Sequence, residues 1–192
     1  MAKGPSYKLP HRRRREKKTN YDRRLALLKN GKPRLVVRKH NKSILVQLIK
    51  YNGEDDDTIG AVNSTELRDF GWNGHNANLP AAYLSGYLLG SKFNEDINEA
   101  VLDIGLQNST KGNLVYATVK GVKDAGIAIP CSDDVIPSEE RIMGEHIVEY
   151  VENMKKSEKE EKFSKYIERG LDPEDLPEHF SEIKDEIGEK YG

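Results

Sequence analysis

Cysteine is nearly absent from this sequence. Cys131 is the one cysteine among 192 residues, so a disulfide within the chain is excluded. A single thiol suits a reducing compartment. No run of about 18 apolar residues occurs, so no segment is expected to span a membrane. The basic N-terminal region also lacks the apolar stretch of a signal peptide, and we expect a cytoplasmic protein.

Motifs of common enzymes are missing as well. The sequence holds no GxxxxGK[ST] phosphate loop, no GxGxxG and no HExxH, and its five histidines are scattered without metal-ligand spacing. The run Asp55–Asp57 is interpreted as a solvated turn. We expect no catalytic residues, no metal, no cofactor and no small-molecule substrate. The alternative is an α/β enzyme that uses Asp103 or Asp124, which would need converging catalytic groups in one concave site.

Positive and negative charge are separated along the chain. Residues 1–50 hold 17 lysines and arginines against two acids, a net charge of +15. Residues 51–192 hold 14 lysines and arginines against 30 acids, a net charge of −16. The overall charge of −1 therefore hides a basic end and an acidic end. The acidic end is expected to point towards solvent or basic neighbouring proteins. The alternative is that its charge simply maintains solubility.

The basic end indicates a nucleic-acid partner. Arginines and lysines recur throughout residues 12–42, with Tyr21 and His40 between them. Guanidinium groups match phosphate oxygens in two-point contacts, and aromatic rings stack on unpaired bases, which RNA loops expose. The alternatives are DNA, a nuclear import signal or an anionic membrane surface. No lipidation motif or large apolar face supplies the second anchor that a membrane surface usually requires.

The first half of the chain predicts an arm followed by strands. Residues 1–15 are expected to form an extended arm, and residues 16–30 a helix with Tyr21, Leu25 and Leu28 on its packing face. Thr19 or Asn20 could cap that helix. Residues rich in β-branched side chains predict a hairpin over 34–40 and 43–51 and a third strand over 58–64.

The second half predicts a βαβ unit and acidic helices. Pro80 suits the first turn of a helix over 79–93, in which Gly86 and Gly90 indicate close packing on the sheet. Residues 100–105 read as a strand buried on both faces, 114–125 as a helix and 127–130 as a further strand. Residues 138–154 predict one helix with Ile142, His146, Ile147, Tyr150 and Val151 on one face. Residues 155–162 predict a solvated helix end or linker, and residues 177–191 a last helix packed through Phe180, Ile183 and Ile187.

These elements predict an α/β fold. We expect a mixed-sheet α/β sandwich with a βαβ unit, a basic extended N-terminal arm and an acidic helical C-terminal extension. The expected organisation is a basic RNA-binding arm with a short helix over residues 1–33, an α/β core over 34–154 and an acidic helical tail over 155–192.

Several long segments resemble one known family. They are GPSYKLPHRRRREKKTNYDRRLALLKNGKPRLVVRKHNK, DFGWNGHNANLPAAYLSGYLLG, EAVLDIGLQNSTKGNLVYATVKGVKDAGIAIP, IPSEERIMGEHI and DLPEHFSEIKDEI. In this order they resemble the ribosomal protein L-eighteen family of archaea, whose eukaryotic members are called L-five. The compact length is similar to that of archaeal members.

The resemblance implies a structural protein of the large (50S) ribosomal subunit. It implies binding to 5S rRNA and attachment of that RNA to 23S rRNA in the central protuberance. It further implies contact with neighbouring large-subunit proteins, including the other 5S-binding protein, and no membrane. A generic nucleic-acid-binding protein is the alternative.

The resemblance places the RNA contacts in the arm and the first hairpin. The residues concerned are Tyr7, Lys8, Arg12, Arg13, Arg14, Arg15, Lys17, Lys18, Tyr21, Arg23, Arg24, Lys32, Arg38, Lys39, Asn41 and Lys42. A second set lies in two later loops: Trp72, Asn73, Asn76, Asn78, Thr110 and Lys111.

Overall fold

A four-stranded mixed sheet organises the first half of the chain in the computed structural model, which describes residues 4–191. The strands lie in the order β3-β2-β1-β4. Their bounds are β1 (Arg34–Lys39), β2 (Ile44–Tyr51), β3 (Asp56–Asn63) and β4 (Val101–Asp103). β2 pairs antiparallel with β1 and β3, whereas β4 pairs parallel with β1. The predicted hairpin and third strand are confirmed, although the third strand begins at Asp56.

Both strands of the predicted βαβ unit are shorter than expected. β4 is an edge strand, so its Val101 and Leu102 are only partly buried, and the expectation of burial on both faces is wrong. After the intervening helix, the predicted strand over 127–130 is reduced to one parallel bridge between Glu99 and Ala128. Ala100 N donates to Ala128 O at 3.0 Å, which keeps the returning chain beside β4.

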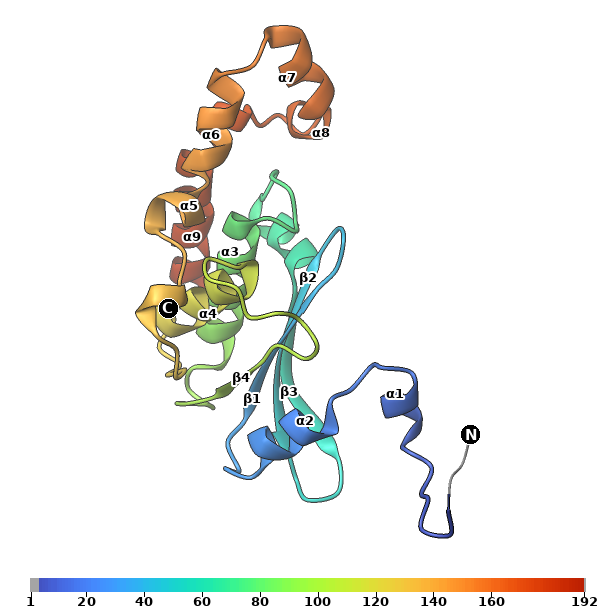
Figure 1. The fold of residues 1–192 in the computed structure, drawn as a ribbon. Coiled ribbons are helices and arrows are strands. Elements are labelled where there is room, and N and C mark those ends of the chain that lie inside the picture. Colours follow the sequence, from blue (N-terminus) through green and yellow to red (C-terminus); the bar gives the residue numbers. More distant parts are fainter. Residues whose placement is uncertain (1–3, 192) are drawn as a thin grey trace.

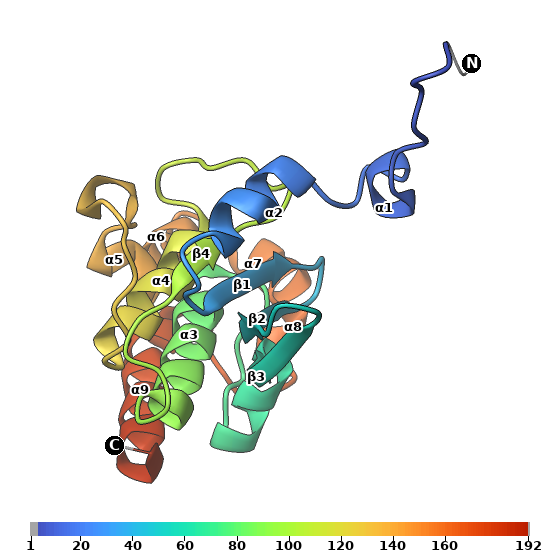
Figure 2. The same ribbon diagram turned by 90° about the horizontal axis from the view of Figure 1, so that it is seen from below.

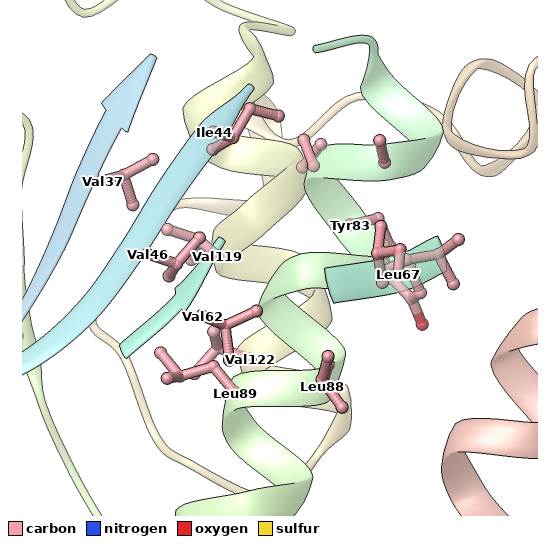
Figure 3. Close-up of a cluster of buried hydrophobic side chains, with 14 of the residues drawn as sticks. Val37, Ile44, Val46, Val62, Leu67, Tyr83, Leu88, Leu89, Val119 and Val122 are labelled. Atoms are coloured by element: carbon pink, nitrogen blue, oxygen red, sulfur yellow. The ribbon is translucent and has the colours of Figure 1, made fainter. Parts of the chain in front are cut away.

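The main core lies between one face of the sheet and two helices, α3 (Leu79–Phe93) and α4 (Leu114–Asp124) (Figure 1). The predicted helix over 79–93 is confirmed, and Asn78 caps it by accepting from Ala81 N at 3.0 Å. Alternate strand residues point into the core, as the two-residue period of a strand requires. Figure 3 shows Val46 and Val62 of the sheet facing Val119 and Val122 of α4.

α3 and α4 approach each other closely through glycines. A Cβ atom on Gly86 would overlap the carbonyl oxygen of Thr118, and one on Gly121 would overlap that of Tyr83. The predicted close packing at Gly86 is therefore present, but it joins helix to helix and not helix to sheet.

A single turn and a short helix precede the sheet. They are α1 (Arg12–Arg15) and α2 (Tyr21–Leu28), and neither contains a buried residue. The arm carries α1 where an extended chain was expected, and it projects from the body of the molecule (Figure 1). The packing face of α2 differs from the prediction, because Leu25 is 57% exposed and Arg24 is partly buried. Residues 1–3 of the predicted arm lie outside the described residues.

The acidic part of the chain forms a series of helices. Their bounds are η1 (Ser64–Phe70), η2 (Asp133–Val135), α5 (Glu139–Met143), α6 (Glu145–Glu152), α7 (Lys156–Lys162), α8 (Ser164–Ile167), η3 (Pro173–Asp175) and α9 (Leu176–Tyr191). Gly144, with a φ of 99°, splits the predicted helix over 138–154 into α5 and α6. The predicted face is only partly buried, since Tyr150 is 52% exposed.

The last helix packs on the core. α9 buries Phe180, Ile183 and Ile187, as predicted, and the rings of Tyr83 in α3 and Phe180 lie 5.4 Å apart. α7 contains no buried residue, in agreement with the predicted solvated segment. Across residues 4–191, no helix has the length and apolar character needed to cross a membrane.

Candidate nucleic-acid interface

The arm presents its cations to solvent. From Gly4 to Lys18 every residue is exposed. Few contacts hold this segment: Arg13 Nε donates to Thr19 Oγ1 at 2.8 Å, and Glu16 pairs with Arg12 at 3.7 Å and Lys18 at 3.1 Å. Exposed ion pairs of this kind contribute little stability, so these side chains are free to meet an external anion.

α2 adds a second basic element beside the sheet. Asn20 begins it, because its side-chain oxygen accepts from Asp22 N and Arg23 N, both at 3.1 Å. Tyr21 is half-buried, with its ring centroid 5.0 Å from that of His11. Arg23 is exposed, whereas Arg24 is partly buried and forms an ion pair with Asp56 at 2.9 Å.

The β1–β2 turn places Lys39, Asn41 and Lys42 on the surface. His40 N donates to Ser43 O at 2.9 Å and closes the turn. All three exposed side chains therefore belong to the end of the hairpin. Arg38, directly before them, is partly buried, and its guanidinium group donates to acceptors within the protein.

Those acceptors belong to Asp103 and to the backbone. Arg38 Nη2 lies 3.1 Å from Asp103 Oδ1, and Arg38 Nη1 donates to the Asp103 carbonyl at 2.8 Å and to that of Val37 at 3.0 Å. Gly105 N donates to Asp103 Oδ1 at 2.8 Å. Burial alone would raise the pKa of Asp103, but Arg38, the Gly105 N–H and Arg34 outweigh it and hold the pKa below its usual value.

Arg34 connects this cluster to α2. It is 3% exposed and lies on the opposite face of β1 from the core residues Leu35 and Val37. Its Nη1 donates to Asp103 Oδ2 at 2.9 Å, and its Nη2 lies 2.8 Å from Asp56 Oδ1. Arg24, Asp56, Arg34, Asp103 and Arg38 thus form one row of alternating charge, which we call the arginine–aspartate row. Sequence reasoning missed it and assigned Asp56 to a solvated turn.

The predicted contact residues fall into two groups by their ion pairs. Five have a carboxylate partner: Arg12, Lys18, Arg24, Lys32 and Arg38. Within residues 4–191, no ion pair is present at Lys8, Arg13, Arg14, Arg15, Lys17, Arg23, Lys39, Lys42 or Lys111. The second group is the larger, and all but Lys111 precede the third strand.

The loop over 72–78 is directed inward. Trp72 is 1% exposed, and its ring stacks on His179 of α9 with centroids 5.3 Å apart. Asn73 N donates to His179 Nε2 at 3.1 Å, Asn76 is 5% exposed and Asn78 caps α3. Trp72 and Asn76 therefore offer no exposed face to a base, and this loop joins the core to the C-terminal helix.

The loop over 104–113 is directed outward. Thr110 and Lys111 are exposed. Gln107 Nε2 donates to Val37 O at 3.3 Å, which attaches the loop to β1. Figure 2 shows this loop and α2 on the same side of the sheet, away from α3. The loop that contains Lys111 therefore passes on the side of the sheet that carries α2.

The carboxylates considered for catalysis have structural partners. Asp124 accepts from the Tyr83 hydroxyl at 2.8 Å and from Lys120 Nζ at 2.7 Å. Asp103 belongs to the arginine–aspartate row. Burial raises the pKa of the Cys131 thiol, which disfavours the nucleophilic thiolate. Among residues 4–191, no group of three or more histidine, cysteine, aspartate or glutamate side chains could hold a metal ion.

A comparison with protein-family models shows the family of this chain. The family model described as ribosomal large subunit proteins 60S L5 and 50S L18 matches residues 5–99 and 92–132. The chain belongs to this family. It is a ribosomal protein of the large subunit, and its place is the cytoplasmic ribosome. The matched residues include the arm from residue 5, α2, the hairpin and both loops, and they end directly before η2 and the helices α5 to α9.

Proposed function

We propose that this ribosomal protein binds 5S rRNA through its arm, α2 and first hairpin and helps to attach it to 23S rRNA in the central protuberance. The observation that carries the proposal is the group of predicted contact cations that form no ion pair within residues 4–191, eight of which lie from Lys8 to Lys42. Arginine forks suit phosphate, and each neutralised phosphate releases counterions.

The proposed contact residues divide by the role that the structure supports. Lys8, Arg13, Arg14, Arg15, Lys17, Arg23, Lys39, Lys42 and Lys111 are available for phosphate. Tyr7 is 47% exposed and available for stacking on a base. Arg12, Lys18 and Lys32 would exchange a solvent-accessible carboxylate for phosphate at little cost, because exposed ion pairs are weak.

The acidic helices are proposed to face away from the RNA. In Figure 1, α7 and α8 lie at the opposite end of the molecule from the arm. A carboxylate within a Debye length of about 8 Å would repel phosphate, and this separation avoids that cost. Neighbouring large-subunit proteins, including the other 5S-binding protein, are the proposed partners of this end. As a structural constituent of the ribosome, the protein requires no substrate and no cofactor.

The direct experiment compares two RNAs. The full chain is titrated with 5S rRNA and with an unrelated folded RNA of equal length, at one salt concentration. The proposal predicts binding to 5S rRNA tighter by an order of magnitude or more, whereas a generic nucleic-acid-binding protein would bind both about equally. Equal affinities would contradict the proposal.

A further inference from the structure

Two carboxylates stand between the arginines of α2 and β1. Asp56 and Asp103 alternate with three arginines in the arginine–aspartate row, which has a formal charge of +1. The row joins four elements: Arg24 belongs to α2, Asp56 to β3, Arg34 and Arg38 to β1, and Asp103 to β4. It therefore connects the helix that carries Arg23 to the hairpin that carries Lys39 and Lys42.

We propose that Asp56 and Asp103 are positioning residues for RNA binding, which hold α2 and the loop after β4 in a fixed relation to the first hairpin. The inference rests on the proposed function, because it names residues that prepare the same surface without touching the RNA. The two carboxylates act through Arg24 and Arg38, whose guanidinium groups they hold against the sheet.

The weak packing of α2 makes such a clamp necessary. None of its eight residues is buried, and Leu25 points into solvent. Within residues 4–191, the Arg24–Asp56 pair is the one ion pair that links α2 to the sheet. The Asp56 side chain is 27% exposed and that of Arg24 34% exposed, so the pair is partly shielded from water. A partly shielded pair is screened less by salt than the exposed pairs of the arm.

Asp103 performs the corresponding task for the loop over 104–113. Its carboxylate accepts from Arg38 and from Gly105 N, and so ties the first residues of the loop to β1. Gly105 has a φ of 62°, and a Cβ atom there would lie 3.1 Å from Arg38 Cζ. The absence of a side chain at Gly105 lets the loop pass over the guanidinium group, on the side of the sheet that carries α2.

Simple electrostatics predicts the opposite effect for these acids. A carboxylate near bound RNA repels phosphate, so its removal should tighten binding and free Arg24 for a phosphate contact. Positioning predicts weaker binding, because a loose α2 must be ordered when the RNA binds, and that ordering costs affinity. The sign of the change in affinity therefore separates the two accounts.

Asp56→Asn is the test variant and Asp55→Asn its matched control. Asp55 is the exposed neighbour of Asp56, it loses the same charge, and it takes part in no ion pair within residues 4–191. We expect Asp56→Asn to weaken binding of 5S rRNA roughly tenfold, and Asp55→Asn to leave it unchanged or slightly tighter. Asp56→Glu, which keeps the charge, should restore part of the loss.

Hydrogen exchange measured without RNA shows whether the loss comes from α2. In Asp56→Asn the amides of α2 should exchange faster, while those of α3 keep their protection. Uniformly faster exchange would indicate a general loss of stability and would overturn the positioning role. An affinity of Asp56→Asn for 5S rRNA equal to or above that of the wild type would overturn it as well. If the wild type fails to prefer 5S rRNA, the proposed function fails, and the exchange of α2 still decides whether Asp56 holds this helix.

Discussion

Gly86 of α3 lies directly against the carbonyl oxygen of Thr118 in α4. A Cβ atom at Gly86 would overlap this oxygen, and a Cβ atom at Gly121 would in turn overlap the Tyr83 carbonyl. Each helix thus lacks a side chain where the backbone of the other passes. This reciprocal contact sets the spacing of the two helices that cover the sheet.

Substitution of Gly86 by alanine should therefore destabilise the fold. The new methyl group would meet backbone and not a flexible side chain, so α3 and α4 must move apart. We expect Gly86→Ala to lower the free energy of unfolding by about 1–3 kcal/mol, as overpacking does in well-packed cores. Urea unfolding measures this directly.

Gly188 in α9 provides the matched control. A Cβ atom there would lie 3.3 Å from the Tyr87 hydroxyl, which can give way. Helix propensity then favours alanine, and Gly188→Ala should raise the free energy of unfolding by up to about 1 kcal/mol. Equal effects of the two substitutions would contradict the close helix contact.

Replacement of Asp103 by asparagine should remove pH-dependent stability. The pKa of Asp103 is lowered in the folded protein, so its carboxylate stabilises the fold fully above the usual carboxyl pKa. This stabilisation is lost as the pH falls through the lowered pKa. Because Arg34 is 3% exposed, Asp103→Asn should cost about 3 kcal/mol near neutral pH. Urea unfolding at several pH values should show the difference from wild type shrinking as the solution becomes acidic.

Asp133→Asn is the control for that series. The Asp133 side chain is 92% exposed and pairs with Lys123 at 3.5 Å, so this substitution should change stability little. A difference between Asp103→Asn and wild type that stays constant in acid would show that the charge of Asp103 is not what stabilises the fold.

His179 should make the contact between α9 and the core sensitive to pH. Burial lowers the pKa of His179 below its usual value, although Glu182 opposes this shift. Asn73 N donates to the unprotonated Nε2, so protonation removes that bond. The stability that this contact contributes is complete above about pH 6.5 and is lost as the pH falls through the lowered pKa.

Trp72 reports this change, because it is the one tryptophan in the chain and stacks on the His179 ring. Its fluorescence should change as the pH falls from about 8 to about 5, in the range where histidine titrates. His179→Phe keeps an aromatic ring and should abolish the change, whereas His146→Phe should leave it intact. A titration that survives in His179→Phe would contradict the assignment.

Local signals predicted much of the fold. Asn78 and Pro80 mark the start of α3, and a long apolar run follows them, so the predicted and observed bounds agree. The strands of the hairpin were predicted from β-branched residues. The predicted strand over 127–130 shrinks to the single bridge at Ala128, since the short edge strand β4 gives it little to pair with.

The prediction was wrong where the partner of a residue lies far along the chain. Leu25 was placed on the packing face of α2, but Arg24 takes that face because Asp56 in β3 offers it an ion pair. The resemblance placed Trp72 among the RNA contacts of lower rank, and the structure shows its ring stacked on His179 and buried. Neither partner can be recognised from the local sequence.

The salt dependence of 5S rRNA binding tests the central claim most directly. The variant with Arg12, Arg13, Arg14 and Arg15 replaced by alanine is compared with a control in which the exposed Lys155, Lys156, Lys162 and Lys165 are replaced. Both lose four positive charges. If the arm neutralises phosphates, the arginine variant should bind more weakly, and its log–log salt slope should be flatter by about 1.5–3.5. The control should keep the wild-type slope, and an unchanged slope in the arginine variant would contradict the account.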